Sequence, residues 1–331
     1  MEKIAVLVNK EFRERVFGEK YYQRLRKSGE VKIYDHDDFS DLNYVVDFVK
    51  GSSIIITSWD SPKIDKNILD VCPDLKAVIH AAGSIKPIIT DEFISRNIRI
   101  ANSAVAIGEG VAETTLGFAI SACKGFYNLN RDTHNGLWQE NIKKYVTDFY
   151  DITIGVISAG QVGRHFIKLL QNFHVDVLVY DPFITEEKAL ELGARKVELN
   201  ELLSSSDVIS VHSPAIKETE NLLNKENLKL IKDGAILINT SRGTVINEQD
   251  LIAELKTGRF FACVDVTNPE PPLKDNELRK LNNVVLTPHI AGTSTNGLKR
   301  VALHVTEEVE RLVRNERMKA EINLEDLAKL A

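Results

Sequence analysis

One stretch of the chain, from Gly155 to Asp181, limits the possible folds more than any other. It starts inside a short β-branched run, Ile152–Ile157, and passes through a glycine-containing turn. The residues after the turn carry apolar side chains at helical spacing, and the apolar run Val175–Tyr180 then ends at Asp181. A strand, a turn, a helix and a second strand in this order predict a βαβ unit with two parallel strands.

The turn of this unit has the residues that a dinucleotide site needs. Gly160 lets the backbone approach a pyrophosphate at the helix N-terminus, and Gly163 lets the helix lie close to the strand. Asp181 follows about 20 residues later, where a carboxylate accepts hydrogen bonds from the adenosine ribose. Because this carboxylate would repel a 2′-phosphate, NAD is favoured over NADP. Ser158 replaces the first glycine of G-x-G-x-x-G, and a plain βαβ core is the alternative.

Composition places the chain among ordinary globular proteins with room for two domains, at 331 residues, 43% hydrophobic and 27% charged. The net charge of −6 argues against nucleic acid or an anionic membrane as a partner. No apolar run has transmembrane length, and the N-terminus leads directly into a strand-like segment, so we expect a cytoplasmic protein. Cys72, Cys123 and Cys263 are widely spaced, which predicts small core residues and no metal site.

Strand-like and helical segments alternate on both sides of the βαβ unit. Residues 3–101 predict a small α/β domain, and the apolar segment Gly110–Cys123 predicts a helix that connects it to the nucleotide unit. The stripe from Leu298 to Leu312 predicts an amphipathic helix that returns to the first domain. Further strand-like runs bring the nucleotide sheet to six strands, the number of a full dinucleotide-binding sheet: Val208–His212, Ala235–Asn239, Ala262–Val266 and Val284–Thr287.

Several segments of the first domain have two interpretations. Asp35–Asp38 is rich in metal-ligand types, but adjacent loop residues seldom converge on one ion, and a solvated loop is favoured. Trp59 follows the strand Ile54–Thr57, where it either lines a pocket or caps the core. The small residues Ala82–Ser84 either expose backbone N–H groups to a substrate carboxylate or form a tight turn. Lys86 is either a second anion contact or a surface charge.

Three residues suit the chemistry that hydride transfer requires. Arg242 follows the strand Ala235–Asn239, and its guanidinium can hold a carboxylate and polarise an adjacent keto oxygen. His289 follows Val284–Thr287 and belongs to the residue type that titrates near neutrality. Glu270 stands between prolines, and a carboxylate beside an imidazole favours the protonated ring. Taken singly, an arginine after a strand is usually a surface residue, and a Pro-His pair is usually a turn. Because both lie at the sheet edge where the cofactor is expected, a catalytic or binding role is favoured for them.

Three segments of the sequence carry a more specific resemblance. They resemble the signature blocks of the D-isomer-specific 2-hydroxyacid dehydrogenases: residues 238–243 (INTSRG), 265–271 (DVTNPEP) and 286–292 (LTPHIAG). The similarity extends over nearly the whole chain. In that family the NAD-binding domain is inserted into the substrate domain, which implies two Rossmann-like domains of α/β class. We expect a flavodoxin-like substrate domain from residues 1–101 and 297–331, and an NAD-binding domain from residues 102–296.

The resemblance also implies roles for particular residues. Arg242 would bind the substrate, His289 would be the acid/base and Glu270 its partner. Asp265 would contact the nicotinamide carboxamide, and the loop Ala82-Gly83-Ser84 resembles the loop that binds the substrate carboxylate. The other predicted cofactor contacts are Gly160, Gln161, Val162, Gly163, Asp181, Ser213, Thr240, Ser241 and Gly292.

The resemblance implies an NAD-dependent enzyme, as a homodimer, that interconverts a small 2-keto acid and its D-2-hydroxy acid. The segment Ile85–Pro87 departs from phosphoglycerate dehydrogenases, whose loop continues with Val-Asp-Asn, and we expect no appended regulatory domain. Two alternatives remain. One is an NAD(H)-sensing module like the corepressors that share this scaffold, and the other is a dehydrogenase of formate or phosphite type.

Overall fold

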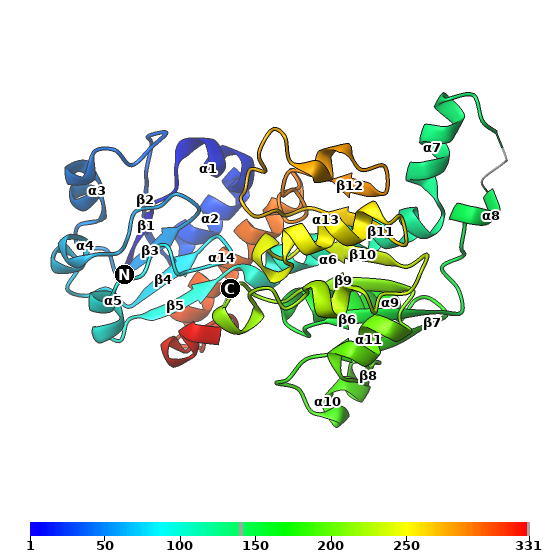
Figure 1. The fold of residues 1–331 in the computed structure, drawn as a ribbon. Coiled ribbons are helices and arrows are strands. Elements are labelled where there is room, and N and C mark those ends of the chain that lie inside the picture. The colour runs from blue at the N-terminus through cyan, green and yellow to red at the C-terminus, as the bar shows by residue number, and fades with distance from the viewer. Residues whose placement is uncertain (139–141, 330–331) are drawn as a thin grey trace. The chain divides into compact units, whose positions relative to one another are not determined.

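The computed structural model describes residues 1–138 and 142–329. The chain divides into two compact units, one formed by Met1–Ile107 with Thr293–Ala331 and the other by Gly108–Gly292. The first unit is therefore built from both ends of the chain, and the second from the stretch between them. Each unit has its own parallel β-sheet (Figure 1).

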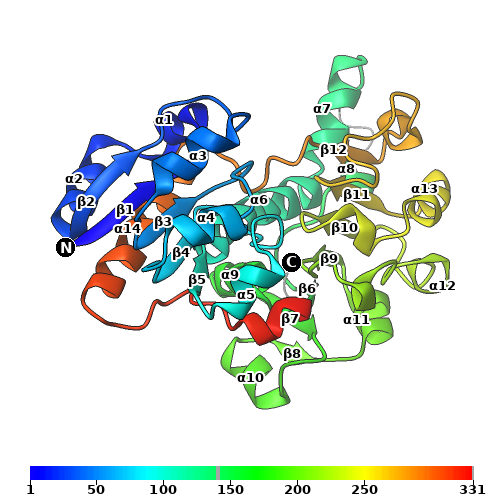
Figure 2. The same ribbon diagram turned by 90° about the vertical axis from the view of Figure 1, so that its left-hand side faces the viewer.

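The first unit contains a parallel sheet in the order β2-β1-β3-β4-β5 (Figure 2). This is the flavodoxin-like order, with the switch in direction between β1 and β3. The inner strands β3 and β4 are fully buried and mainly apolar, because helices cover both of their faces. Their bounds are β1 Glu2–Val6, β2 Gly29–Ile33, β3 Ile54–Thr57, β4 Ala77–His80 and β5 Arg99–Asn102.

Alternate residues of these strands enter two separate cores. One core joins Ile4, Val6 and Ile56 to α1, α2 and α14, and the other joins Ala5 and Ile55 to α3, α4 and α5. The strand period of two residues explains the division. The helices are α1 Lys10–Val16, α2 Glu19–Ser28, α3 Leu42–Val49, α4 Lys66–Val71, α5 Asp91–Ser95 and α14 Leu298–Val313.

The end of the chain pairs with the edge of this sheet. Ile322 N donates to Ile100 O at 2.8 Å, and Arg99 forms a two-pronged ion pair with Glu321, with both contacts at 2.8 Å. The helix α14 and the tail beyond it, including the 3₁₀ segment η4 Leu324–Lys329, thus belong to the first unit.

The second unit has the order β12-β11-β10-β9-β6-β7-β8 among its described residues. From β8 to β11 this is the dinucleotide-binding order, in which the strand direction along the sheet switches between β6 and β9. The predicted count of six strands was wrong, because β8 was missed: it has only two residues, both charged, and so has no apolar run. The bounds are β6 Ile152–Ile157, β7 Val175–Tyr180, β8 Arg195–Lys196, β9 Val208–Val211, β10 Ile236–Asn239, β11 Phe261–Val264 and β12 Val284–Leu286.

Helices cover both faces of this second sheet. One core contains α6 and α9 with Val156 and Val179, and the other contains α11, α12 and α13 with Ile209 and Leu237. The two cores account for the predicted α/β class, which is confirmed. The helices are α6 Ala104–Cys123, α7 Phe126–His134, α8 Ile142–Tyr145, α9 Gln161–Leu170, α10 Glu186–Glu191, α11 Leu199–Ser205, α12 Lys225–Leu228 and α13 Glu248–Lys256, with 3₁₀ turns at η1 Lys217–Thr219, η2 Gly243–Val245 and η3 Glu277–Lys280.

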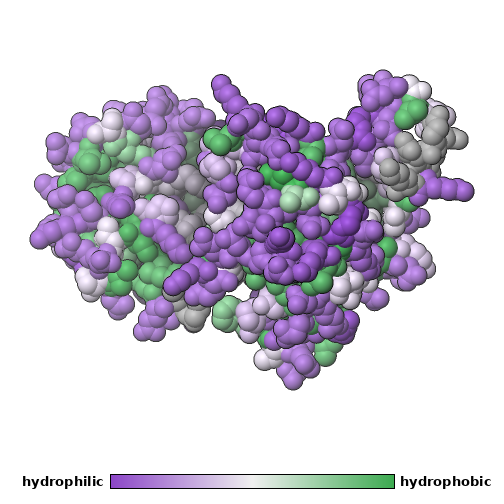
Figure 3. Space-filling model, in the orientation of Figure 1, coloured by the Kyte–Doolittle hydropathy of each residue, from purple (hydrophilic) through white to green (hydrophobic). Residues whose placement is uncertain are grey.

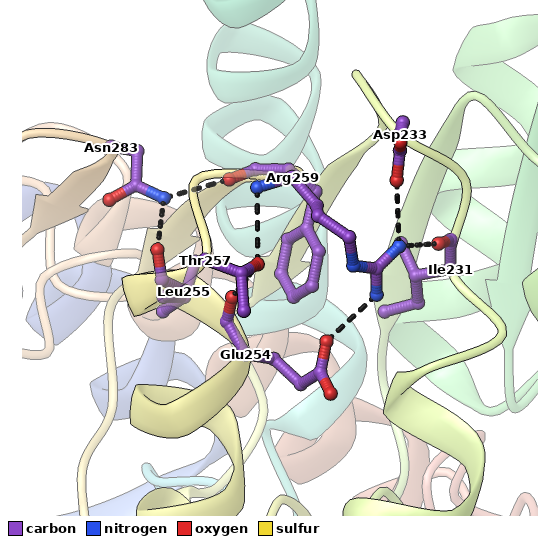
Figure 4. A network of polar contacts seen from close by, with 8 residues as sticks. Ile231, Asp233, Glu254, Leu255, Thr257, Arg259 and Asn283 are labelled. Atoms are coloured by element: carbon purple, nitrogen blue, oxygen red, sulfur yellow. Dashed lines mark hydrogen bonds and ion pairs between the residues drawn. The ribbon is translucent and has the colours of Figure 1, made fainter.

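A polar network ties together the loops that precede β10, β11 and β12 (Figure 4). Arg259 donates to Ile231 O at 2.7 Å, to Asp233 at 2.9 Å and to Glu254 at 2.8 Å. Asn283 donates to the carbonyls of Leu255 and Phe260, each at 2.9 Å. This network lies at the amino ends of the strands, so the opposite edge is the one left for ligands.

The surface shown in Figure 3 is mainly hydrophilic, with dispersed hydrophobic side chains. Among the described helices, none is both long and apolar enough to cross a membrane. All three cysteines are buried, and none forms a disulfide within the described part of the chain. In the part of the chain that the structure describes, no group of three or more His, Cys, Asp or Glu residues could hold a metal ion.

Candidate active site

The turn between β6 and α9 leaves an open space where an anion can bind. Gly160 is the N-cap of α9 and supplies no side-chain cap, and a Cβ built on it would meet no atom within 4 Å. The N-terminus of α9 is the positive end of the helix dipole, and its first N–H groups are those of Gln161 and Val162. No capping side chain at Gly160 covers these groups. Gly163 is required for a different reason, because its Cβ would lie 2.1 Å from Ser158 O.

Asp181, at the end of β7, is buried and holds this turn in place. Its carboxylate accepts a hydrogen bond from Ala159 N at 2.8 Å and another from Phe183 N at 2.8 Å. It thus joins the loops that leave the neighbouring strands β6 and β7. Ser158, which replaces the first glycine of the motif, has a positive φ of 77° that glycine would adopt at less cost.

His212 and Ser213 follow β9, next to the point where the strand order switches. Both side chains are buried. His212 Nε2 pairs with Ser210 Oγ at 2.9 Å, and its buried Nδ1 has no partner among the described residues. Burial lowers the pKa of His212 to about 3, so the ring is neutral near pH 7. An unpaired polar atom at this edge fits a bound polar group.

The loop after β10 is braced by Asn239, a buried residue at the end of the strand. Asn239 Oδ1 accepts hydrogen bonds from Ser241 N at 3.0 Å and Ser241 Oγ at 2.8 Å, and its Nδ2 donates to Arg242 O at 3.1 Å. The Thr240 hydroxyl pairs with the Thr115 hydroxyl at 3.0 Å. These contacts fix the backbone from which the Arg242 side chain extends.

Gly243 permits the close approach of two loops. A Cβ on this residue would lie 2.1 Å from Thr267 O, so only glycine fits without a shift of backbone. The loop after β10, which carries Arg242, thereby touches the loop after β11, which leads to Glu270. The requirement for glycine at this position is steric and follows from packing.

Asp265, directly after β11, is almost fully buried and anchors the loop that carries His289. Its Oδ1 accepts hydrogen bonds from the Thr287 hydroxyl and from Ile290 N at 3.0 Å, and its Oδ2 accepts one from Ala291 N at 2.9 Å. His289 N also donates to Asp265 O at 2.9 Å. One aspartate therefore determines the path of the chain up to Ala291, next to Gly292.

His289 Nδ1 lies 2.5 Å from Glu270 Oε1, and both side chains are partly exposed to solvent. Since an ionised carboxylate only accepts hydrogen bonds, the proton of this contact belongs to Nδ1, which leaves Nε2 for a ligand. His289 has a positive φ of 52°. For a residue with a Cβ, this backbone conformation costs on the order of 1 kcal/mol or more and is often found at functional sites.

Arg242 is half-buried in this region, and burial lowers the pKa of its guanidinium, while the Glu270 carboxylate opposes that shift. Arg242 Nη1 donates to Ser241 O at 2.7 Å, and other N–H groups remain for a ligand. The second unit thus brings Arg242, Glu270 and His289 to the loops at the carboxyl ends of β10, β11 and β12.

The first unit contains the predicted carboxylate loop after β4. Ser103 N donates to Ala82 O at 2.9 Å, and Asn102 Nδ2 donates to Gly83 O at 2.7 Å. The carbonyls of this loop are thus held, whereas neither Ala82 N nor Gly83 N donates to another described residue. A Cβ on Gly83 would meet no atom within 4 Å. Ser84 follows them, partly exposed.

The other candidates of the first unit are placed as follows. Asp35 pairs with Arg13 at 2.7 Å in an exposed loop, in keeping with the solvated-loop interpretation. His80 is buried and pairs with the Thr57 hydroxyl at 2.9 Å, and burial lowers its pKa to about 4. His304 Nε2 contacts Asn102 O at 2.9 Å. Lys86 is exposed.

Two contributors were missed by sequence reasoning. Asn239 braces the Arg242 loop, and the sequence contains a feature from which this role could have been predicted. A polar residue that ends an apolar strand often forms hydrogen bonds with the turn that follows. Thr115 lies on α6, and nothing in the sequence links it to Thr240. The anchoring of the His289 loop by Asp265 was also not foreseen, since hydrogen bonds across 20 or more residues leave no local pattern.

Comparison with known proteins identifies the family of this chain. The family model described as "D-isomer specific 2-hydroxyacid dehydrogenase, NAD binding domain" matches residues 116–291. Hydroxypyruvate reductase of Blautia hydrogenotrophica is 31% identical over 291 residues, which are 86% of this chain and 89% of that protein. D-3-phosphoglycerate dehydrogenase of Archaeoglobus fulgidus is 30% identical over 302 residues, but this chain spans only 56% of its length.

A solved structure of a D-isomer specific 2-hydroxyacid dehydrogenase from Lactobacillus delbrueckii ssp. bulgaricus, in its NAD-complexed form, has the same fold. The TM-score is 0.80 at 21% identity, and the match covers 97% of this chain and all of the other. The chain therefore belongs to the D-isomer specific 2-hydroxyacid dehydrogenases, a family of NAD-dependent oxidoreductases.

Proposed function

We propose that this protein interconverts a small 2-keto acid and its D-2-hydroxy acid, with NAD as the redox partner. The observation that carries the proposal is the contact of 2.5 Å between His289 Nδ1 and Glu270, in the unit that also holds the nucleotide turn. A histidine positioned by a carboxylate is an arrangement for moving protons. Arg242 on a neighbouring loop supplies a site for an anionic substrate.

The residues of the second unit fit a dinucleotide. The open space at Gly160 and the uncapped start of α9 suit a pyrophosphate, and Asp181 suits a ribose hydroxyl. The buried, unpaired Nδ1 of His212 fits a polar group at the same edge. When bound, NADH supplies the hydride that reduces a keto carbon. We assign Ser213, Thr240, Ser241, Asp265 and Gly292, all on loops of the second unit, to holding the cofactor.

His289 is assigned as the acid in the reduction direction. Its Nδ1 is held by Glu270, so a protonated ring donates from Nε2 to the oxygen of the keto group as that oxygen gains negative charge. In the oxidation direction the neutral ring accepts the hydroxyl proton at Nε2.

Arg242 is assigned to binding and polarising the substrate. Its remaining N–H groups can form two parallel hydrogen bonds to a carboxylate and the adjacent keto oxygen. Partial burial strengthens these bonds because water competes less. For the first unit we propose that the amides of Ala82–Ser84 bind a carboxylate, since two of them have no protein acceptor among the described residues.

The proposal is tested by mixing the purified protein with NADH and a panel of 2-keto acids, with NADH absorbance as the readout. We expect turnover with at least one of them and a product of D configuration by chiral chromatography. Tight binding of NADH without any turnover would indicate a cofactor-sensing module. Reduction of NAD by formate or phosphite alone would indicate the other type of dehydrogenase. The homodimer and the cytoplasmic location stay predictions.

A further inference from the structure

His80 is a buried histidine of the first unit that the proposed chemistry does not use. It is the last residue of β4, just before the Ala82–Ser84 loop, and only 2% of its surface is exposed. Its Nδ1 lies 2.9 Å from the hydroxyl of Thr57, on the neighbouring strand β3, and its ring also forms a hydrogen bond with the backbone of Ser84. One buried ring thus connects β3 to the last residue of the loop.

The two contacts of His80 define the state of its ring. Burial lowers the pKa of His80 to about 4, and the hydrogen bond to the Ser84 backbone opposes this shift. A carbonyl acceptor acts in that direction, so the ring donates to Ser84 O. Since the contact with Thr57 uses Nδ1, the N–H that faces Ser84 belongs to Nε2. Near pH 7 the neutral ring therefore donates to the loop and accepts from the Thr57 hydroxyl.

The carbonyls that precede Ser84 are also held by donors of the same unit. Ser103, a fully buried residue, donates from Oγ to His80 O at 3.0 Å and from its backbone N to Ala82 O at 2.9 Å. Asn102 Nδ2 donates to Gly83 O at 2.7 Å. Together with the contact from His80, these bonds fix three successive carbonyls, those of residues 82–84.

Fixed carbonyls determine where the N–H groups of the loop point. The C=O and N–H of one trans peptide unit point in opposite directions. Gly83 N, in the same unit as Ala82 O, therefore points away from Ser103, and it has no acceptor among the described residues. The loop thus presents an N–H group to a ligand because its carbonyls are bound on the other side.

We infer that His80 is a positioning residue for substrate binding, which joins Thr57 to Ser84 O and so holds the Ala82–Ser84 loop with its amides directed at the substrate carboxylate. This inference rests on the proposed function. Because the ring is buried, it acts on the substrate only through the loop. The carboxylate does not change during hydride transfer, so the loop binds the ground state and the transition state alike. Loss of His80 should therefore raise KM much more than it lowers kcat.

The test measures kcat and KM with NADH for the best 2-keto acid of the panel, and the Kd of oxamate for the NADH complex by calorimetry. His80→Leu has an apolar side chain of similar volume and forms neither hydrogen bond. It should raise KM and the Kd of oxamate by about tenfold or more, with kcat within about threefold and the Kd of NADH unchanged. His80→Gln can donate to Ser84 O and accept from Thr57, so it should stay within about threefold of the wild type in every quantity.

Thr57→Val is a milder variant of the same network, because it removes only the hydroxyl that donates to His80. It should raise KM by about threefold or more while kcat is kept. Thr306→Val is the matched control: Thr306 is also fully buried in the first unit, but its hydroxyl donates within α14, to Ala302 O at 2.7 Å. This control should leave KM and the Kd of oxamate unchanged.

Unchanged KM and oxamate affinity in both His80→Leu and Thr57→Val would overturn the inference and leave the proposed function standing. Equal losses in His80→Gln and His80→Leu would also overturn it. If His80→Leu fails to fold, the comparison of Thr57→Val with Thr306→Val decides. A wild type that binds oxamate, more weakly in His80→Leu, but reduces no 2-keto acid would overturn the proposed function alone. A wild type that neither binds oxamate nor reduces a 2-keto acid would overturn both.

Discussion

The Asp181 carboxylate accepts hydrogen bonds from Ala159 N and Phe183 N, each at 2.8 Å, and so shapes the nucleotide turn. The same carboxylate is the proposed acceptor for the ribose of NAD. The Asp181 side chain thus has two roles, holding the turn and accepting from the ribose. A substitution of Asp181 would remove both.

We therefore expect Asp181→Ala to weaken NADH binding by about tenfold or more without a gain in NADPH affinity, because a lost hydrogen bond to buried N–H groups costs on the order of 1–3 kcal/mol. Fluorescence titration of both cofactors measures this. Asp176→Ala, on the exposed start of the same strand, is the control and should bind NADH normally. An Asp181→Ala variant that bound NADPH as tightly as the wild type binds NADH would refute the double role.

At the level of elements, the loop from Thr287 to Ala291 owes its conformation to Asp265. Three donors of this loop converge on one buried carboxylate, and His289 takes up a left-handed backbone conformation within it. The conformation of this loop is thus set by Asp265, directly after β11, rather than by the sequence of the loop itself. The Pro-His pair in the sequence therefore does not reveal how the loop is held.

Asp265→Asn should lower kcat by about tenfold or more while the protein stays folded, because an amide group cannot accept from all three donors and His289 would shift. A displacement of about 1 Å at a catalytic group has large effects on rate. Asp207→Asn is the control: Asp207 also accepts a backbone hydrogen bond, from Thr153 N at 2.8 Å, but at the amino ends of the strands. If Asp265→Asn and Asp207→Asn had the same modest effect on kcat, the anchoring role would be wrong.

The elements themselves were largely predictable from the sequence. Apolar β-branched runs located β3, β6, β7 and β10, because a strand covered on both faces consists mainly of apolar residues. The pattern failed at β8, which has two charged residues, and at the start of α6, which begins at Ala104 and not at Gly110. In the candidate site, the sequence motifs identified the loops on which the proposed site residues lie. They did not predict the hydrogen bond between the Thr115 and Thr240 hydroxyls, because that contact depends on how α6 packs.

For the whole molecule, two buried histidines, one in each unit, link stability to pH. Burial lowers the pKa of His80 to about 4 and that of His212 to about 3, both from an ordinary value of 6.5. The unfolded chain therefore binds more protons than the folded chain below pH 6.5. The contribution of each neutral ring to the free energy of unfolding is fully present above pH 6.5. It is lost as the pH falls toward the pKa that the ring has in the folded protein.

The free energy of unfolding should thus fall by up to about 1.4 kcal/mol per pH unit for each ring as the pH decreases from 6.5 toward 4. Urea unfolding at a series of pH values measures the slope. His212→Gln should remove one proton from the uptake on unfolding, and a further His80→Gln should remove another. An unchanged slope in the double variant would show that these rings are not the cause.

Proton transfer by His289 is tested most directly by single-turnover reduction of a 2-keto acid by His289→Gln with NADH. We expect a loss of about 100-fold or more in rate with NADH affinity unchanged, since glutamine cannot donate the proton. His174→Gln, at an exposed histidine of the same unit, should react like the wild type. A rate near that of the wild type in His289→Gln would contradict the account.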